Sequence, residues 1–403
     1  MPIRFAGWSV VWVAFTVAAF AWGIGFYGPG VFLQTLHASK GWPIATISAA
    51  ITTHFLVGAA IVVYLPEAHR AIGIARATMI GAVLTAAGIV AWSMTLSPWQ
   101  LFAAAFISGG GWALTSGAAI NAMIAPWFDR DRPMAISHAF NGASIGGVVF
   151  TPLLVSMIDG IGFPATALVV GLAMVIVVAP LAHRYLRQGS EDLGLAPDGQ
   201  PLDRARPRPE SEARLPRAAL MRTRAFVTVS TAFALALFAQ VGLLSHLLSR
   251  LSPVLGTTAA AAAMSLTTIS AVAGRLLLGW LIGDHDRRYA ACANFLVQSI
   301  GVVLLCVTNS PLLLLVGCVL FGLGVGNVAA IPALIAQTEF RAVDLGTVVA
   351  LVIATNQAVF ALAPAALGAI RDASTNYTLS FAIAAVIEVA AAITVLAGRQ
   401  RRR

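Results

Sequence analysis

Long apolar segments recur along the chain, and short polar or charged stretches separate them. Each segment has about 20 predominantly apolar residues, the length at which an α-helix crosses a hydrocarbon core of ~30 Å. The pattern predicts an all-α membrane protein. We expect twelve spans, at residues 8–36, 43–65, 73–96, 99–125, 133–158, 163–186, 224–248, 257–283, 289–308, 312–337, 344–370 and 377–397.

The composition agrees with this pattern. Of the 403 residues, 59% are hydrophobic and only 10% are charged, which is far from the average of soluble globular proteins. The three cysteines lie in apolar segments without CxxC spacing. The sequence has no zinc motif, phosphate loop or Ser/His/Asp arrangement. We therefore expect neither an enzyme nor a bound metal or cofactor.

Most basic residues lie on one side of the predicted membrane. The chain has 25 Lys and Arg residues, and 21 of them lie at the two termini or in the connections that follow even-numbered spans. By the positive-inside rule, we expect a multi-pass protein of the cell (inner) membrane with both termini in the cytoplasm. The net charge of +9 then reflects topology and attraction to anionic lipid, and not nucleic-acid binding.

The two halves of the chain contain a weak internal repeat. AMIAPWFDR, at residues 122–130, matches ALIAQTEFR, at residues 333–341, with an offset of 211 residues. The repeat predicts six helices plus six. Between them, a stretch rich in Arg, Pro, Gly, Asp and Glu cannot bury a core and is predicted to be a flexible tether. The expected organisation is a bundle at 1–186, a cytoplasmic linker at 187–220 and a second bundle at 221–403.

One cation lies inside an apolar segment. Arg275 stands nine residues before Asp284, where a charged run begins, so it lies roughly 13 Å inside the membrane, near its middle. Such a charge costs at least ~3 kcal/mol on insertion scales and faces a protein interior or a watery cavity. No acidic residue shares the apolar part of this segment, which favours an anionic substrate as its partner. The alternative is a structural partner, either Glu388 or carbonyl groups at a helix end.

Other polar residues at membrane depth are candidates to accompany Arg275. Tyr27 lies in a glycine-rich run and either lines a pore or belongs to the interfacial belt. His54 either carries a proton, contacts substrate or is a packed core residue. Glu388 is a proton site, a counter-ion to Arg275, or a local structural or assembly residue. The remaining candidates for substrate binding are the amides Asn141, Gln240, Asn356 and Gln357.

Several motifs resemble those of the major facilitator superfamily over nearly the whole chain. GRLLLGWLIGDHDRR, at residues 274–288, is similar to the loop signature that follows helix eight in that superfamily. LPEAHRAIGIAR, at residues 65–76, is a degenerate version after helix two without the usual Asp. GFYGPGVFLQTL, GWPIATIS and APWFDRDRPMAISHAFNGASIGG are similar to the oxalate/formate antiporter and monocarboxylate transporter group. The resemblance implies two pseudo-symmetric six-helix bundles, with gating residues Asp284, Arg287, Arg288 and Arg130.

The resemblance also implies a function. That group places in helix eight an arginine that holds the substrate carboxylate, and Arg275 occupies this position. Its oxalate exchangers carry a second cation, a lysine, in helix eleven, where this chain has Asn356 and Gln357. A single fixed cation suits a monoanion better than a dianion. The implied activity is secondary transport of a small organic anion, a monocarboxylate, by alternating access, either with a proton or in exchange for a second carboxylate.

The coupling proton has no carrier at the positions that the resemblance suggests. Animal monocarboxylate carriers have a lysine near the position of Tyr27, and an acid one turn before the helix-eight arginine, where this chain has Ala271. His54 is therefore the leading proton carrier, with Glu388 as a second candidate.

Two other functions stay open. Multidrug efflux antiporters of the same fold usually carry a Gly-Pro pair in the glycine motif of helix five, whereas GASIGGVVFTP has its proline later. A non-transporting sensor or assembly factor predicts a large folded domain outside the membrane, and the one long loop is the linker. We expect a monomer whose partners are the lipid bilayer and a small carboxylate.

Overall fold

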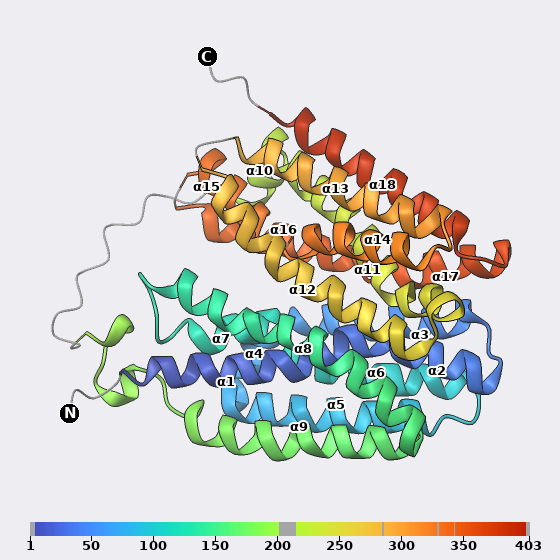
Figure 1. The fold of residues 1–403 in the computed structure, drawn as a ribbon. Coiled ribbons are helices and arrows are strands. Elements are labelled where there is room, and N and C mark those ends of the chain that lie inside the picture. Colours follow the sequence, from blue (N-terminus) through green and yellow to red (C-terminus); the bar gives the residue numbers. More distant parts are fainter. Residues whose placement is uncertain (1–4, 201–214, 284–285, 329, 342, 400–403) are drawn as a thin grey trace. The chain divides into compact units, whose positions relative to one another are not determined.

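The computed structural model describes residues 5–200, 215–283, 286–328, 330–341 and 343–399 (Figure 1). The helices of the first half are α1 (Gly7–Phe20), α2 (Gly28–Lys40), α3 (Ile44–Val62), α4 (Leu65–Ile72), α5 (Ile74–Ser93), α6 (Pro98–Thr115), α7 (Gly117–Ile124), α8 (Arg132–Ile161) and α9 (Phe163–Tyr185). Those of the second half are α10 (Arg217–Met221), α11 (Arg224–Leu255), α12 (Thr257–Leu281), α13 (Arg287–Val307), α14 (Pro311–Val325), α15 (Ile331–Glu339), α16 (Leu345–Phe360), α17 (Ala363–Ser374) and α18 (Thr378–Ala397).

The prediction of an all-α membrane protein is confirmed. Among the described residues, eleven helical segments are long and apolar enough to cross a membrane, and they lie at eleven of the twelve predicted positions. At the tenth position the structure has a shorter apolar helix, α14. The chain therefore follows the predicted order of spans, with a shorter helix at the tenth position.

The tenth predicted span, 312–337, is divided into α14 and α15 rather than continuous. Three glycines, Gly322, Gly324 and Gly326, weaken the helix where it ends. Pro332 stands in the first turn of α15, where its missing N–H leaves no hydrogen bond unmade. Pro364 has the same place in α17, which follows the end of α16 in the predicted eleventh span. Glycine content and Pro332 explain the break between α14 and α15, and Pro364 marks the start of the helix after the break between α16 and α17.

The first predicted span contains a π-helical segment, Ala21–Tyr27, between α1 and α2. It coincides with the glycine-rich run in which the sequence places Tyr27. A π-helical turn inside an α-helix widens the backbone spiral and occurs often at functional sites.

The chain divides into two compact units. Unit 1 comprises Met1–Ser39 and Thr53–Pro207, and unit 2 comprises Lys40–Thr52 and Arg208–Arg403. The first part of α3 belongs to unit 2 because it contacts α17. The Ala45 N–H donates to Asp372 Oδ2 at 2.7 Å, and Thr52 Oγ1 accepts from the Ala365 N–H at 3.1 Å.

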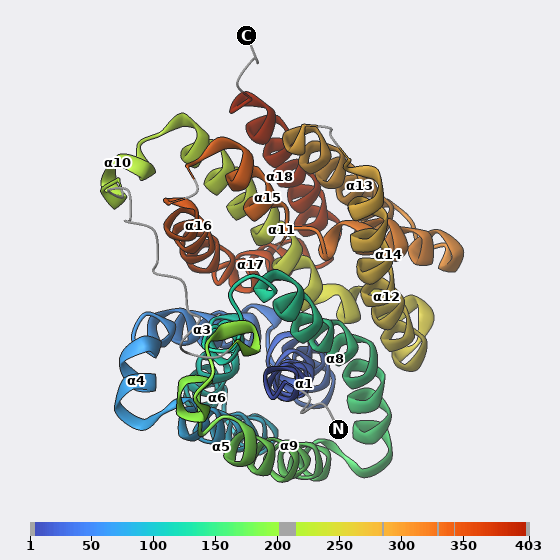
Figure 2. The ribbon, with the colours of Figure 1, turned by 90° about the vertical axis from the view of Figure 1, so that its left-hand side faces the viewer.

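Helix α1 lies inside unit 1, with α8 and α9 packed on it (Figure 2). Small residues allow the closest of these contacts. A Cβ atom on Gly142 of α8 would overlap the carbonyl oxygen of Phe15 in α1, and one on Gly146 would overlap that of Ala19. Close backbone approach of this kind replaces the hydrophobic driving force that helices lack in lipid.

In unit 2, α11 packs against α12, α16, α17 and α18, and α13 packs against α14 and α18. The apolar core between these helices is built from aliphatic and aromatic side chains that are almost wholly buried. It includes Phe226, Val229, Ala232, Phe233, Ala236, Ala291, Phe295, Val348, Val352, Ala391, Ala392 and Val395.

The α1–α8 contact predicts a position-dependent effect of adding one methyl group. Gly142→Ala should destabilise unit 1 by about 1–3 kcal/mol, because the new Cβ overlaps the α1 backbone. Gly160→Ala is the matched control on the same helix, since a Cβ there meets no atom within 4 Å. Unfolding of the purified protein, followed in detergent, measures the difference. Equal stability of the two variants would contradict the packing described.

Candidate functional site

Arg275 lies on α12, where that helix makes its closest contact with α14. A Cβ on Gly274 would overlap the Leu323 carbonyl oxygen, and one on Gly326 would lie 2.5 Å from the Ala271 carbonyl oxygen. The same Cβ on Gly326 would lie 3.1 Å from Nη2 of Arg275. The absence of a side chain at Gly326 therefore leaves room for the guanidinium group, which is half-buried.

Two buried asparagines bind the backbone at the end of α14, beside this contact. Asn327 donates from Nδ2 to Asn294 Oδ1 at 2.9 Å, to the Leu323 carbonyl at 3.1 Å and to the Gly274 carbonyl at 3.4 Å. Asn294 in turn donates to the Gly324 carbonyl at 3.2 Å. These side chains satisfy carbonyl groups that the interrupted helix leaves open, and they join α12, α13 and α14 next to Arg275.

The guanidinium group of Arg275 therefore lies beside a close helix contact that hydrogen bonds hold in place. It keeps some exposure to solvent. A guanidinium group presents donors in a planar fork that matches a carboxylate, and such charge-assisted pairs are stronger than neutral hydrogen bonds. Arg275 can therefore hold a carboxylate bidentately, which is the chemistry that the sequence predicts for it.

The other candidates in unit 2 differ in burial. Gln240 on α11 and Asn356 on α16 are 4% exposed, and each has a buried side-chain oxygen without a hydrogen bond among the described residues. Gln357 is half-buried. Glu388 on α18 is fully buried, and neither of its carboxyl oxygens accepts a hydrogen bond within the described part of the chain.

In unit 1, His54 is held in a hydrogen-bonded packing site. Its Nδ1 lies 2.8 Å from Ser108 Oγ on α6. Ser108 also accepts from Trp92 Nε1 on α5 at 3.1 Å and donates to the Ala105 carbonyl at 3.2 Å. His54 thus links α3, α5 and α6, and its ring is 2% exposed. Its Nε2 is buried and lacks a hydrogen bond of good geometry in the described chain.

Tyr27 and Asn141 lie in different environments. Tyr27 ends the π-helical segment and is 8% exposed, with its ring against Phe26. Asn141 is exposed on α8, whose buried face consists of neighbouring small residues such as Gly142.

An aromatic cluster surrounds the π-helical segment, and the sequence reasoning did not identify it. Trp112 on α6 contacts Trp22 and Phe26, with ring centroids 5.0 and 6.1 Å away, and Phe55 on α3 at 6.3 Å. The indole N–H of Trp112 is buried and donates to no described residue. The aromatic residues of WGIGFY, beside the GGGW run of α6, are the sequence signal for this cluster.

The predicted gating residues lie in two places, with Arg287 and Arg288 in the first turn of α13 and Arg130 in the loop before α8. Asp284 lies outside the described residues. Arg287 donates to the Gly283 carbonyl at 2.6 Å, near the end of α12. Arg130 is exposed and paired with Asp131, while its backbone N–H donates to Asp198 Oδ2 at 2.9 Å. Asp198 follows α9, so the chain after unit 1's last long helix folds back onto the loop that carries Arg130.

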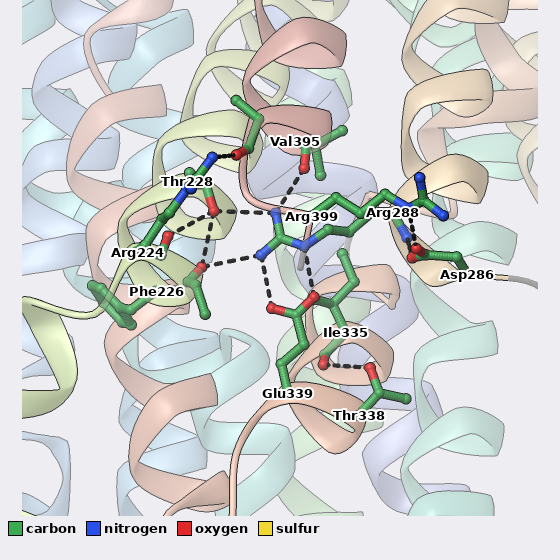
Figure 3. A network of polar contacts seen from close by, with 12 residues as sticks. Arg224, Phe226, Thr228, Asp286, Arg288, Ile335, Thr338, Glu339, Val395 and Arg399 are labelled. Carbon is green, nitrogen blue, oxygen red and sulfur yellow. Dashed lines mark hydrogen bonds and ion pairs between the residues drawn. The ribbon is translucent and has the colours of Figure 1, made fainter. Parts of the chain in front are cut away.

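Arg288, the fourth gating candidate, is completely buried at the centre of a polar network (Figure 3). Its Nε and Nη2 donate to the two carboxyl oxygens of Glu339 at 2.6 and 2.8 Å. The remaining donors reach the carbonyls of Val395 and Ala225 and the hydroxyl of Thr228, at 2.7, 3.4 and 3.1 Å. These contacts use the full donor capacity of the guanidinium group and join α11, α13, α15 and α18.

Glu339 is the acid whose carboxylate accepts from the Arg288 guanidinium group, and it was not among the predicted site residues. It lies in ALIAQTEFR, one copy of the internal repeat. An acid next to a basic loop at the end of a span was the available signal. What the sequence could not show is that the acid meets Arg288, which is 51 residues away.

Comparison with known proteins identifies the family. The model of the Major Facilitator Superfamily matches residues 11–364 and, in a second overlapping match, residues 259–403. The chain therefore belongs to the Major Facilitator Superfamily. It is a multi-pass membrane transporter and not an enzyme.

One relative and two solved structures illustrate the likeness. Monocarboxylate transporter 13 of Bos taurus is 26% identical over 394 residues, which cover 94% of this chain and 86% of that protein. The nucleoside transporter NupG has a TM-score of 0.74 at 12% identity, over 98% of this chain and 99% of that chain. A bacterial homologue of the human lysosomal transporter Spinster has a TM-score of 0.73 at 14% identity, over 96% of both chains. The two structures show a shared fold.

The contacts of Arg288 predict a large loss of stability when the carboxylate that binds its guanidinium group is removed. Glu339→Gln keeps the shape of the side chain but removes the charge that the buried guanidinium group of Arg288 binds directly, so stability should fall by about 3–5 kcal/mol. Glu67→Gln breaks the exposed pair with Arg70, and its effect should stay within about 1 kcal/mol. Equilibrium unfolding in mixed micelles gives both values. A small loss in Glu339→Gln, equal to that of the control, would show that the pair contributes little.

Asp286, which caps α13, predicts a loss of stability in acid. Burial disfavours its charged form, but hydrogen bonds from the Arg288 N–H and the Arg399 guanidinium outweigh burial, and the pKa of Asp286 lies below its ordinary value. A depressed pKa stabilises the folded protein above the unfolded pKa, and this contribution is lost as the pH falls below about 4.

The pH effect is measured by melting curves between pH 6 and pH 3. Wild type should lose more stability over this range than Asp286→Asn, which lacks the carboxylate. Arg399→Gln removes one of its partners and should move the acid loss to higher pH. Identical pH profiles for all three proteins would exclude this role of Asp286.

Proposed function

We propose that this transporter carries a small monocarboxylate and that Arg275 binds its carboxylate group. The observation that carries the proposal is the place of Arg275, half-buried in the last third of the membrane-spanning helix α12, with its guanidinium group against Gly326 at the break between α14 and α15. Ionisable groups inside a membrane protein bundle mark substrate or ion pathways. Arginine is suited to bidentate binding of a carboxylate.

The other candidates in unit 2 favour one negative charge on the substrate. The amides Gln240, Asn356 and Gln357 are uncharged hydrogen-bonding groups, and two of them have a buried oxygen without a described partner. Such groups suit the hydroxyl or amide of an organic acid better than a second carboxylate. We further propose that these three amides contact the substrate, together with Tyr27 and Asn141.

The relative supports the substrate class. Monocarboxylate transporter 13 is named for monocarboxylate transport, and the alignment with it covers 94% of this chain. We infer the same class of substrate here, moved by alternating access of a carrier that binds one small acid at a time.

We propose that a proton or a second carboxylate completes the cycle, with His54 and Glu388 as the proton candidates. The hydrogen bonds of Ser108 suggest which atom of His54 would act. The single hydroxyl hydrogen of Ser108 is directed to the Ala105 carbonyl, so His54 Nδ1 would be the donor to Ser108 and Nε2 would carry the free lone pair. Nε2 is therefore the atom that we assign to proton uptake.

For the orientation, we propose that both termini lie in the cytoplasm and that the protein acts as a monomer in the cell (inner) membrane. The basic residues support this side, since 21 of the 25 Lys and Arg lie at the ends of the chain or in the same set of connections. The bundles 1–186 and 221–403, with a linker at 187–220, complete this topology.

Transport in proteoliposomes tests the proposal. Uptake of radiolabelled lactate, pyruvate, formate, acetate and oxalate is measured with and without an inward proton gradient. Wild type should take up a monocarboxylate. Arg275→Ala should reduce the rate at least about 30-fold, because losing a charged partner costs 2–5 kcal/mol. Arg275→Lys should keep part of it, since lysine keeps the charge but not the planar fork.

The matched control is Arg184→Gln, which removes an exposed arginine in the last turn of α9. It should transport at the wild-type rate. Uptake that persists in well-folded Arg275→Ala would contradict the role of Arg275. No uptake of any acid by folded wild type would favour efflux of a drug or a larger organic anion instead.

A further inference from the structure

A cavity of about 310 Å³ lies in unit 1 where α4 ends, α5 begins and α9 ends. Three basic side chains line it, namely Arg76 on α5, His183 on α9 and Arg187 just beyond α9. Its other walls are apolar and include Met79 and Leu186. The proposed carboxylate site involves none of these residues, so the cavity is a separate feature of the chain.

A second cavity, of about 230 Å³, adjoins the first and shares Leu186 and Arg187 with it. It adds His69 of α4, whose Nε2 is buried without a hydrogen bond in the described chain. Because burial lowers the pKa of His69, this ring is uncharged near neutral pH and contributes a hydrogen-bonding atom rather than charge. The two cavities together form one cleft, which we call the α5–α9 cleft.

The charge in the α5–α9 cleft is of one sign. No Asp or Glu lines either cavity. Three acids close to lining residues already accept hydrogen bonds: Glu67 from Arg70 at 3.0 Å, Asp192 from the Gly189 N–H at 2.7 Å, and Asp198 from the Arg130 N–H at 2.9 Å. Among the described residues, neither Arg76 nor Arg187 forms an ion pair. The cleft therefore attracts an anion.

The backbone of α5 adds donors to the same place. Its first residues, from Ile74 to Arg76, line the cleft, and its N-cap residue Gly73 has no side chain to bind the open N–H groups. The start of a 20-residue helix carries a partial positive charge, and its N–H groups point along the axis toward an anion. Phosphate groups bind at such places when basic side chains converge there.

The surroundings of the cleft are those of a lipid headgroup. Both α5 and α9 are long and apolar enough to span the membrane. Their outward faces carry apolar side chains that are 44–61% exposed, namely Ile80 and Val83 on α5 and Leu172 and Ile176 on α9. An acyl chain lying on these faces would bring its headgroup to the helix ends, where the arginines lie.

We propose that the α5–α9 cleft binds the phosphate group of an anionic phospholipid, with Arg76, Arg187 and the start of α5 as its ligands. A soluble phosphate compound would share this chemistry. The apolar walls of the cleft and the exposed apolar faces beyond it favour the lipid. The site does not depend on which substrate is carried.

Native mass spectrometry of the full-length protein, titrated with phosphatidylglycerol or phosphatidylcholine, tests the proposal. Wild type should bind phosphatidylglycerol preferentially. The double variant Arg76→Gln/Arg187→Gln should lose on the order of tenfold in affinity for this lipid. The matched control, Arg70→Gln/Arg184→Gln, removes the same charge from outside the cleft and should lose less than about twofold. Melting curves in phosphatidylcholine show that each variant is folded.

Two results would overturn the lipid site. Equal losses in the two double variants would show that general surface charge attracts the lipid. Equal binding of phosphatidylglycerol and phosphatidylcholine by wild type would show that the cleft does not select an anionic headgroup.

A third experiment distinguishes a lipid phosphate from a soluble phosphate. If inorganic phosphate or glycerol 3-phosphate stabilises wild type as strongly as phosphatidylglycerol, and only the cleft variant loses this effect, the ligand is a soluble phosphate and the lipid assignment is wrong.

Discussion

The close contact of α12 with α14 is the constraint on which the proposed transport chemistry depends. Gly274, Gly322 and Gly326 let the two backbones approach so closely that a Cβ at any of the three would meet a carbonyl oxygen. The absence of side chains at these glycines also makes room for the guanidinium group of Arg275 and favours the early end of α14. Asn327 and Asn294 then bind the Leu323 and Gly324 carbonyls at the end of α14, which the break exposes. A membrane protein tolerates an interrupted helix only where such groups are satisfied, so the cation and the break are supported together.

Arg288 shows the contrasting use of an arginine in the same unit. Its guanidinium donates to the Glu339 carboxylate, to two carbonyls and to a hydroxyl, and it is fully buried. These partners suit a residue that holds four helices together. Arg275 is only half-buried, which suits a group that meets a small molecule. The two arginines lie 13 residues apart in one sequence motif, and their surroundings differ as a structural role and the proposed binding role require.

Hydrophobic segment length predicted the all-α fold and the order of the spans, because crossing a membrane requires a run of apolar residues that is visible in the sequence. Arg275 was visible for the same reason, as a charge within such a run. The break after Gly326 was not predicted, since glycine content alone does not say whether a helix ends. The pairing of Arg288 with Glu339, the Trp112 cluster and the α5–α9 cleft depend on which helices pack together. The sequence placed Asn141 within a predicted span, whereas its exposure is decided by the rotation of α8.

Direct binding of an acid and its amide tests the central claim, that Arg275 recognises a carboxylate. Calorimetry on purified protein compares lactate with lactamide, which has the same shape but no charge, in wild type and in Arg275→Gln. Wild type should bind lactate at least about 30-fold more tightly than lactamide, and the variant should bind both equally weakly. If lactate proves a poor ligand, the same comparison uses whichever acid wild type transports. Equal discrimination by wild type and variant would contradict the role of Arg275 as the carboxylate-binding residue.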